Sequence, residues 1–444
     1  IGGISMSGLA EILLEEGFTI TGSDSKESPL TRHLEEKGAR IYYGQKASNI
    51  EAEPGIQVVV YTAAIHPDNP EFKAAKDKNI PMLTRAELLG ELMHNYKESV
   101  AVSGTHGKTT TTSMITDILL AADTDPTISV GGILKDIGGN IRVGGPDLFV
   151  TEACEYTNSF LSFYPTIEVI LNIEEDHLDF FKDINDIRHS FRLFAEKLPK
   201  GGLLVINSSI ENINEITSGL PCRIVTFGKD LSSMYTAQNI TYDEFARPSY
   251  DLVVQGEIVN RITLGVTGEH NVYNSLAAIA VAEHYQVPWN VMEQVLHTLQ
   301  VPGRIEMLSV SPRFIVLVDY AHNAMALEAL LTTLQDYHPG RIICIFGCGG
   351  NRSAERRFQM GEVAGRLADL VVVTTDNPRD EDPEKIADEI CRGLDATKGK
   401  YGRIPDRGDA IAYGISHAKP GDIVVIAGKG HEKYQEICGQ KFPM

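Results

Sequence analysis

The stretch from Gly104 to Thr112 reads GTHGKTTTT and follows a short apolar run, SVAVS. The segment SMITDILLAA comes next and predicts a helix, so the layout is strand, glycine-rich turn, lysine, hydroxyl and helix. In such a turn, backbone N–H groups and a helix N-terminus face phosphates, Lys108 adds a positive charge, and the Thr109 hydroxyl can reach Mg²⁺. Val102 stands where the usual pattern has a glycine before Gly107. A simple turn with a surface lysine is the alternative, and the flanking strand and helix disfavour it.

The composition is that of an ordinary globular protein of two to four domains. The chain has 444 residues, of which 43% are hydrophobic and 23% charged, and its formal net charge is −20. This acidity argues against a general binder of nucleic acid or of membrane surfaces. No apolar run reaches the length of a membrane span, and no signal peptide is visible. The six cysteines lack zinc-type pairing, so we expect a reduced, cytoplasmic location.

The first 24 residues, IGGISMSGLAEILLEEGFTITGSD, resemble the opening of a dinucleotide-type βαβ unit. A glycine- and serine-rich turn leads into a helix, and a strand follows that ends on Asp24. The signal is weak by itself, because it fits NAD, another nucleotide or a tight helix–sheet contact. A nicotinamide oxidoreductase would rest on this turn alone and would leave Lys108 unexplained.

Two later segments place carboxylates and a histidine at the ends of expected strands. The segment Leu148–Leu161 reads LFVTEACEYTNSFL, and the apolar run IEVILN is followed by IEEDHLD. Such strand ends are where α/β proteins place metal and phosphate ligands, so Glu152 and His177 are candidate metal ligands. Helix capping is at least as good an explanation for the acids Glu155, Glu174 and Glu175.

A further helix is expected in GEHNVYNSLAAIAVAEHY, and its first turn carries Asn271 and Asn274. These amides could cap the helix or hydrogen-bond a base, and the sequence leaves both possibilities open. A break near Tyr96 and the turn PGRIE, which starts at Pro302, divide the chain. We expect domains at residues 1–96, 97–302 and 303–444.

The last third predicts a doubly wound parallel sheet whose strands end in polar or glycine-rich loops. These strands lie in FIVLVDYAH, RIICIFGCGG, LADLVVVTTDNPR and GDIVVIAGKGHE. Basic residues converge at the loops and imply an anionic ligand; they are Arg352, Arg356, Arg357, Arg379 and Lys429. A solvated rim is the competing explanation, and it suits Arg356 and Arg357 better than Arg352 and Arg379. Cys344 and Cys348 are interpreted as core or turn residues.

Taken together, the motifs GTHGKTT, EDHLD, GEHNVYNSLAA, PGR, DYAH and GKGHE resemble those of the Mur ligases, over nearly the whole chain. The resemblance implies an α/β protein of three domains: a Rossmann-like UDP-nucleotide domain, a central P-loop ATPase domain and a C-terminal Rossmann-like domain. It also implies an ADP-forming ligase that uses ATP and two Mg²⁺ ions. Such enzymes join an amino acid to a UDP-N-acetylmuramoyl nucleotide during synthesis of peptidoglycan precursors.

The resemblance divides along the chain. About the first 300 residues are similar to the alanine-adding branch of the family. The motifs that carry this similarity are GGISMSG, TGSD, EACEYTNSFL and NIEEDHLD. Arg192 also stands where other branches carry a carbamylated lysine. The last third is similar to the branch that adds meso-diaminopimelate, on DYAHNAMALEALL, FGCGGNRSAERR, DNPR and AGKGHEKYQ. Ligation of L-alanine to UDP-N-acetylmuramate is the first expectation, and ligation of meso-diaminopimelate to the L-alanyl-D-glutamate derivative is the alternative.

A non-catalytic nucleotide-binding protein is an alternative of another class. It would be expected to have lost Lys108, Glu152 or His177, and all three are present.

The resemblance also implies roles for single residues. Lys108 would bridge the β- and γ-phosphates, Thr109 and Glu152 would hold one Mg²⁺, and His177 would hold the second. Arg304 would approach the γ-phosphate, Asp319 the ribose, and Asn271 and Asn274 the adenine, with Lys108, His177 and Arg304 as the catalytic set. The expected ATP contacts are Gly104, Thr105, His106, Gly107, Lys108, Thr109, Thr110, Asn271, Asn274, Arg304 and Asp319. The expected UDP-nucleotide contacts are Gly3, Ser5, Ser7 and Asp24. The expected amino-acid contacts are Arg352, Asp376, Asn377, Arg379, Gly428 and Glu432. His322 is a candidate for the base that deprotonates the amine.

Overall fold

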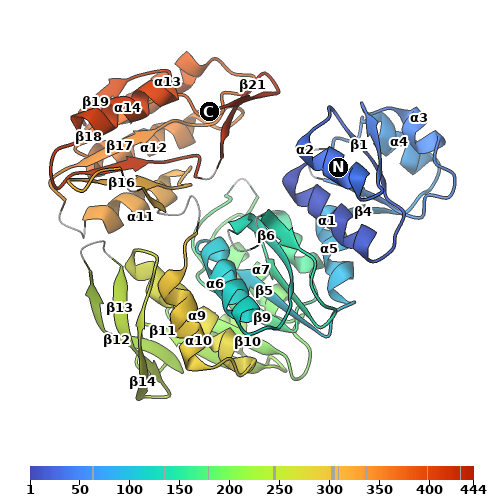
Figure 1. Ribbon diagram of the computed structural model, residues 1–444, viewed down its shortest axis with the longest axis horizontal. Helices are drawn as coiled ribbons and strands as arrows, with labels where there is room; N and C mark the ends of the chain where they lie inside the picture. Colours follow the sequence, from blue (N-terminus) through green and yellow to red (C-terminus); the bar gives the residue numbers. More distant parts are fainter. Residues whose placement is uncertain are drawn as a thin grey trace. The chain divides into compact units, whose positions relative to one another are not determined.

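The computed structural model describes residues 1–62, 65–134, 137, 139–178, 180–243, 247–301, 306–308, 310–335, 339–397, 399–430 and 432–444. The chain divides into two compact units, which are described separately (Figure 1). The first unit comprises Ile1–Thr241, Ser249–Leu264 and His270–Leu299. The second unit comprises Tyr242–Pro248, Gly265–Glu269 and Gln300–Met444.

The N-terminal part of the first unit alternates helices and short strands, as the sequence predicts. Its elements are α1 (Ile4–Glu15), β1 (Thr21–Asp24), α2 (Pro29–Glu36), β2 (Arg40–Tyr43), α3 (Ala47–Glu51), β3 (Val59–Tyr61), α4 (Pro70–Asp77), β4 (Met82–Thr84) and α5 (Arg85–Met93). Strands β1 and β2 pair in parallel, and so do β3 and β4. Two helices begin with capping boxes, at Ser28 for α2 and at Thr84 for α5, which satisfy backbone N–H groups that the helix leaves free.

A ten-stranded sheet forms the body of the first unit. Its strands are β5 (Glu98–Ser103), β6 (Thr127–Leu134), β7 (Gly139–Arg142), β8 (Leu148–Glu152), β9 (Ile167–Ile170), β10 (Leu203–Asn207), β11 (Arg223–Gly228), β12 (Tyr235–Tyr242), β13 (Pro248–Val254) and β14 (Glu257–Thr263). They are ordered β14-β13-β12-β11-β10-β9-β5-β8-β6-β7. Strand β5 therefore lies between β9 and β8 and is parallel to both, which brings three strand ends together.

Helices cover the sheet and supply its core. They are α6 (Lys108–Ala121), the 3₁₀ segment η1 (Tyr156–Ser162), α7 (Ile184–Ala195), α8 (Ile213–Thr217), α9 (Glu269–His284) and α10 (Trp289–Thr298). Helix α6 packs beside α10 and against β5, β6 and β8 (Figure 1). The fully buried rings of Phe160, Phe191 and Phe194 join η1 to α7 in one apolar cluster. Burying such rings removes a large apolar area from water and favours folding.

The second unit contains a six-stranded sheet with helices on both faces. Its elements are β15 (Glu306–Leu308), β16 (Ile315–Val318), α11 (Ala324–Gln335), β17 (Ile342–Phe346), α12 (Ala354–Leu367), β18 (Leu370–Val373), α13 (Pro383–Thr397), β19 (Tyr401–Arg403), α14 (Arg407–His417), β20 (Ile423–Ile426), β21 (Tyr434–Ile437) and β22 (Gln440–Pro443). The order is β15-β16-β20-β17-β18-β19, and only the edge strand β15 is antiparallel among the described pairs. The predicted doubly wound sheet is confirmed.

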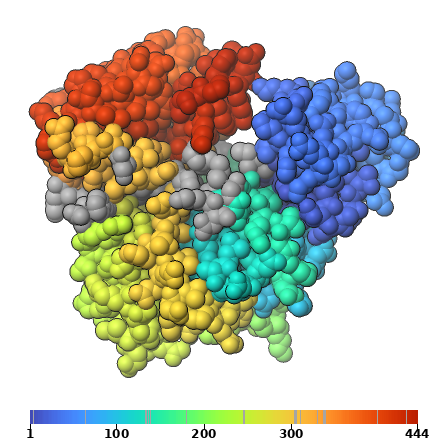
Figure 2. Space-filling model, in the orientation of Figure 1, coloured from blue at the N-terminus to red at the C-terminus, as the bar shows by residue number. Residues whose placement is uncertain are grey.

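The hairpin of β21 and β22 lies outside that sheet. Every residue of β22 is exposed, and the hairpin forms part of the surface shown in dark red in Figure 2. Across the described residues, we find no helix that combines the length and the apolar character needed to cross a membrane.

Candidate active site

The predicted strand, turn and helix are present around Lys108. Strand β5 ends at Ser103, the turn follows, and α6 begins at Lys108. The backbone φ is +134° at Gly104 and +84° at Gly107, which glycine adopts without the strain that a side chain would bring. A Cβ on Gly107 would also lie 2.6 Å from Asn274 Oδ1. The second glycine of the motif is therefore required both by the turn and by the close approach of α9.

The segment after β9 braces this turn. The Asn172 side chain accepts a hydrogen bond from His106 N–H at 2.8 Å and donates one to the His106 carbonyl at 3.1 Å. The Thr105 hydroxyl accepts from Glu174 N–H at 2.9 Å. Sequence analysis missed Asn172, although its place directly after the buried run of β9 was a signal that could have found it.

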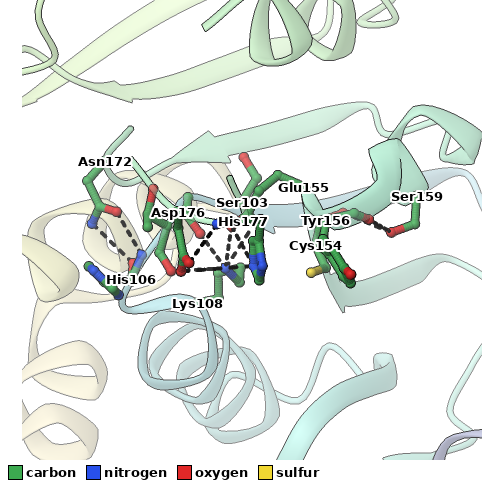
Figure 3. Close-up of polar contacts among 12 residues, drawn as sticks. Ser103, His106, Lys108, Cys154, Glu155, Tyr156, Ser159, Asn172, Asp176 and His177 are labelled. Carbon is green, nitrogen blue, oxygen red and sulfur yellow. Dashed lines mark hydrogen bonds and ion pairs between the residues drawn. The ribbon is translucent and has the colours of Figure 1, made fainter. Parts of the chain in front are cut away.

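The Lys108 ammonium group folds back onto its own turn. It donates to the carbonyl oxygens of Gly104 and Thr105, and it lies 3.1 Å from Glu155 Oε2 (Figure 3). The Lys108 side chain is 17% exposed and that of Glu155 only 3%. An ion pair in a site this poorly hydrated holds the lysine firmly, because neither charge is well solvated.

Glu155 also lies beside His177. The distance from His177 Nε2 to Glu155 Oε1 is 3.9 Å, and the distance from the same nitrogen to Asp176 Oδ2 is also 3.9 Å. The ring of Tyr156 stacks on the imidazole with centroids 4.4 Å apart, which fixes the plane of the histidine (Figure 3). Glu155, for which the sequence makes helix capping at least as good an explanation, is thus the carboxylate that lies beside both the lysine and the histidine. Its exposure of 2% is a tertiary property that no local pattern gives.

Glu152 occupies the end of β8, next to Val102 of β5. Its carboxylate accepts a hydrogen bond from Gly131 N–H of β6 at 2.9 Å. Thr109 lies in the first turn of α6, and its carbonyl accepts from the Ser113 hydroxyl. The neighbouring Thr110 is buried.

The donor set suits a hard divalent cation that is completed by ligand oxygens. In the described residues no three His, Cys, Asp or Glu side chains form a preassembled metal group. Mg²⁺ is usually bound by one or two carboxylates together with water and phosphate oxygens, so a full protein cage is not expected. Glu152, Glu155, His177 and the Thr109 hydroxyl are donors of that kind, and of these Glu155 and His177 lie beside each other.

Asn271 and Asn274 are both buried on the first two turns of α9. Asn274 Nδ2 donates to Asn271 Oδ1 at 2.8 Å, and Asn274 lies against Gly107 as described above. The structure therefore brings these amides to the phosphate-type turn.

The N-terminal candidates gather at the start of α1. Gly3 is the N-cap, and Ser5 and Ser7 follow on the first two turns. Asp24 lies at the end of β1, and its Oδ2 accepts from Gly2 N–H at 2.7 Å. A carboxylate beside a helix N-terminus is favourable electrostatically, so this arrangement also stabilises the fold.

The second unit has a polar pocket at the carboxyl ends of its parallel strands. All six expected amino-acid contacts line it: Arg352, Asp376, Asn377, Arg379, Gly428 and Glu432. Tyr320, His322, Cys348, Gly349, Arg356 and Arg357 complete the lining. The grouping of residues from four separate loops confirms that the topology makes these strand ends converge.

The buried Lys429 joins two residues that line this pocket, Asn377 and Glu432. Its ammonium group donates to Asn377 Oδ1 at 2.7 Å and lies 3.1 Å from Glu432 Oε2. Asn377 Nδ2 donates to the same Glu432 oxygen at 3.0 Å. Asp376 lies 3.8 Å from both Lys429 and the buried Arg407. The lysine is 2% exposed, so its charge is balanced by these partners and not by water.

Two further residues that line the pocket, Arg379 and Cys348, differ in what they do there. Arg379 donates to the Gly350 carbonyl at 2.8 Å and lies 3.5 Å from Glu436 Oε2, which ties the loop after β17 to the hairpin. Burial raises the pKa of the Cys348 thiol to about 12, so that thiol stays neutral and is no nucleophile at neutral pH. The interpretation of Cys344 and Cys348 as core or turn residues agrees with their burial.

Several expectations need correction. Arg357 is not part of a solvated rim: it is 2% exposed and forms ion pairs with Glu381 and Glu389. Arg352 is the exposed one, and its guanidinium donates to the neighbouring Asn351 carbonyl. Pro302 and Arg304 lie outside the described residues.

Two other positions have structural partners. Asp319 is buried in the second unit, where its carboxylate accepts from Ala321 N–H at 2.7 Å. Arg192 donates to the carbonyls of Ile216 and Ser218, so it ties α7 to the end of α8.

A phosphate-type turn on a central parallel sheet, together with a second doubly wound unit, defines the class as a nucleotide-binding α/β protein. Comparison with family models then matches residues 1–97 to "Mur ligase family, catalytic domain", 102–282 to "Mur ligase middle domain" and 303–430 to "Mur ligase, glutamate ligase domain". The chain belongs to the Mur ligase family.

Individual relatives are more specific. The chain is 48% identical to UDP-N-acetylmuramate–L-alanine ligase of Lachnospira eligens over 97% of this chain and 94% of the relative. It is 42% identical to the enzyme of the same name from Lachnoclostridium phytofermentans, over the same shares. Among solved structures it resembles UDP-N-acetylmuramate-alanine ligase of Thermotoga maritima, with a TM-score of 0.76, 26% identity and coverage of 97% and 94%. Because these matches run through the last third, the expected division between two branches is not supported.

Proposed function

We propose that the protein is an ATP-dependent ligase that joins L-alanine to UDP-N-acetylmuramate. The observation that carries the proposal is the placement of Lys108 at the N-terminus of α6 beside Glu155 and His177, in a chain 48% identical to an alanine ligase over 97% of its length. A cytoplasmic location stays a prediction.

The reaction begins with a carboxylate, which is a poor acyl donor. Transfer of the γ-phosphoryl group of ATP to that carboxylate gives an acyl phosphate and ADP. The amine of the amino acid then attacks the acyl carbon, and phosphate leaves from the tetrahedral intermediate. Both steps build up negative charge, so fixed positive groups and positioning supply most of the acceleration.

We assign the ATP site to the turn 104–107 and the first turn of α6. Lys108 is assigned to the β- and γ-phosphates. Asn172 fixes the path of the turn through the His106 N–H and carbonyl, and the turn places the N-terminus of α6 at the phosphate oxygens. Asn274 lies next to Gly107 and donates to Asn271, and both amides are assigned to the adenine. The remaining assignments, Arg304 to the γ-phosphate and Asp319 to the ribose, rest on the family resemblance.

Thr109 and Glu152 would hold one Mg²⁺, and His177 would hold a second. The ions would supply charge neutralisation at the transferring phosphoryl group. Tyr156 stacks on His177 and keeps the plane of its ring fixed.

The amino acid is assigned to the pocket of the second unit. Arg352 and Arg379 are the cations for its carboxylate, and Asp376, Asn377 and Glu432 are the acceptors for its ammonium group. The UDP-nucleotide is assigned to Gly3, Ser5, Ser7 and Asp24. The proposed domain boundaries are 1–96, 97–302 and 303–444.

Phosphate release tests this function when two nucleotides are crossed with two amino acids. The nucleotides are UDP-N-acetylmuramate and its L-alanyl-D-glutamate derivative, and the amino acids are L-alanine and meso-diaminopimelate. We expect turnover with UDP-N-acetylmuramate and L-alanine alone. Turnover only with the L-alanyl-D-glutamate derivative and meso-diaminopimelate would contradict the proposal. The residues of the second unit would then be the better guide to the substrate.

A further inference from the structure

We infer that Glu155 makes nucleotide binding depend on a divalent cation, because it is the counter-charge that Lys108 must leave when phosphates bind. The inference rests on the proposed function, since it takes ATP as the ligand of the turn. It assigns to Glu155 a role in coupling two ligands, which is separate from holding the protein together.

The contacts of Lys108 are the first step. Its ammonium group has two backbone carbonyls and Glu155 as partners, and Glu155 is the carboxylate among them. An ammonium group has three N–H donors, and these contacts use them all. Phosphate oxygens can therefore be bound by Lys108 only if at least one present partner is given up.

The burial of Glu155 is the second step. Its side chain is 3% exposed, so water does not replace a lost ion-pair partner. A buried charge whose partner is removed is strongly destabilising. Phosphates that draw Lys108 away also bring more negative charge near Glu155, and Coulomb repulsion is strong in a poorly hydrated site. Nucleotide alone is thus disfavoured by Glu155.

The replacement cation is the third step. Among the described residues, the cationic groups within ion-pair distance of Glu155 are Lys108 and His177. His177 is also a candidate metal ligand, and its Nε2 lies 3.9 Å from Glu155 Oε1. A divalent ion that enters with the phosphates restores a counter-charge to Glu155 at this place. Binding of nucleotide and of cation then favour each other, as any coupling between two sites requires.

Glu152 provides the contrast. Its carboxylate is held by Gly131 N–H, and Lys108 is not among its described partners. Loss of its charge should weaken the response to Mg²⁺ without strengthening metal-free ATP binding. Loss of the Glu155 charge should weaken the response to Mg²⁺ and also strengthen metal-free ATP binding.

The experiment is equilibrium binding of ATP by calorimetry to the full chain, in EDTA and in excess Mg²⁺ at matched ionic strength. The variants are Glu155→Gln, which is isosteric and neutral, Glu155→Asp, which keeps the charge, and Glu152→Gln. Glu175→Gln is the matched control, because Glu175 is an exposed acid in the segment after β9. Thermal unfolding of each variant verifies that it is folded.

For Glu155→Gln we expect metal-free ATP to bind at least about fivefold more tightly than to the wild type, because one repulsive charge is gone. The ratio of affinities with and without Mg²⁺ should fall by at least about threefold. Glu155→Asp and Glu175→Gln should keep the wild-type ratio. Unchanged or weaker metal-free binding by folded Glu155→Gln overturns the inference and leaves the proposed function intact. Absence of ATP binding by the wild type in Mg²⁺ overturns both.

Discussion

Asn172 and His106 are joined by two hydrogen bonds, one from the His106 N–H to Asn172 Oδ1 and one from Asn172 Nδ2 to the His106 carbonyl. The amide side chain thus pairs with the backbone of His106 in the way that a neighbouring strand would. It fixes both polar groups of one peptide position at the centre of the phosphate-type turn.

Replacement of Asn172 by alanine should therefore loosen the turn. We expect a loss of about 1–3 kcal/mol in the free energy of unfolding, because two backbone groups lose their partners. The affinity for ATP should fall about tenfold, since the turn that positions Lys108 and the start of α6 is no longer preorganised. Calorimetric binding and urea unfolding measure the two effects. ATP affinity unaltered in Asn172→Ala would contradict the bracing role.

Replacement of Lys108 by alanine should abolish turnover, with a fall in kcat of at least about a thousandfold, because the fixed charge at the phosphates is gone. The variant should also be less stable by about 3–5 kcal/mol, since Glu155 is left buried without its partner. The double variant Lys108→Ala/Glu155→Gln should recover most of that stability and none of the turnover. Phosphate release and urea unfolding separate the two roles. Ligation that persists in folded Lys108→Ala would rule out the assigned site.

Glu168 predicts a dependence of stability on pH. It lies on β9 between Ala101 and Leu204, and neither of its oxygens has a hydrogen-bond partner among the described residues. Burial raises its pKa well above the usual range, so the folded protein keeps a proton that the unfolded chain releases. Stability must therefore fall as the pH rises above the ordinary glutamate pKa of about 4.3, up to the raised value.

Glu168→Gln should remove this loss, because the amide does not titrate. We expect the variant to gain stability relative to the wild type by more than about 1 kcal/mol between pH 5 and pH 7. Urea unfolding of both proteins at the two pH values measures the difference. A difference that does not change with pH would show that Glu168 is ionised in the folded protein.

Arg379 should determine the affinity for the amino acid. Its guanidinium lines the pocket of the second unit and ties the Gly350 carbonyl to Glu436. Arg379→Ala should raise the KM for the amino acid by at least about tenfold and change the KM for ATP less than about twofold. Arg366→Ala is the control, because Arg366 forms an exposed pair with Glu328. Steady-state kinetics with each substrate varied in turn measure the two KM values. A parallel rise of the KM for the amino acid and the KM for ATP would contradict the assignment.

The sequence by itself determined the local chemistry of this protein. The pattern GTHGKTTTT after an apolar run predicted the strand, turn and helix, because glycine, lysine and hydroxyl spacing acts within one turn of chain. The alternation of helices and strands likewise predicted the doubly wound sheet of the second unit. The six expected amino-acid contacts come to one pocket because parallel strands place their carboxyl ends at one edge.

Only the tertiary structure decided which of these groups meet. Strand β5 lies between β8 and β9, and this order brings Glu155 to Lys108 and Asn172 to His106 from segments far apart in the chain. The same is true of Arg357, whose neighbours in sequence suggested an exposed rim and whose acidic partners come from another loop and helix. Burial and ion pairing depend on long-range packing, so a local pattern of residues cannot fix them, whereas a turn or a helix start depends on a few consecutive residues.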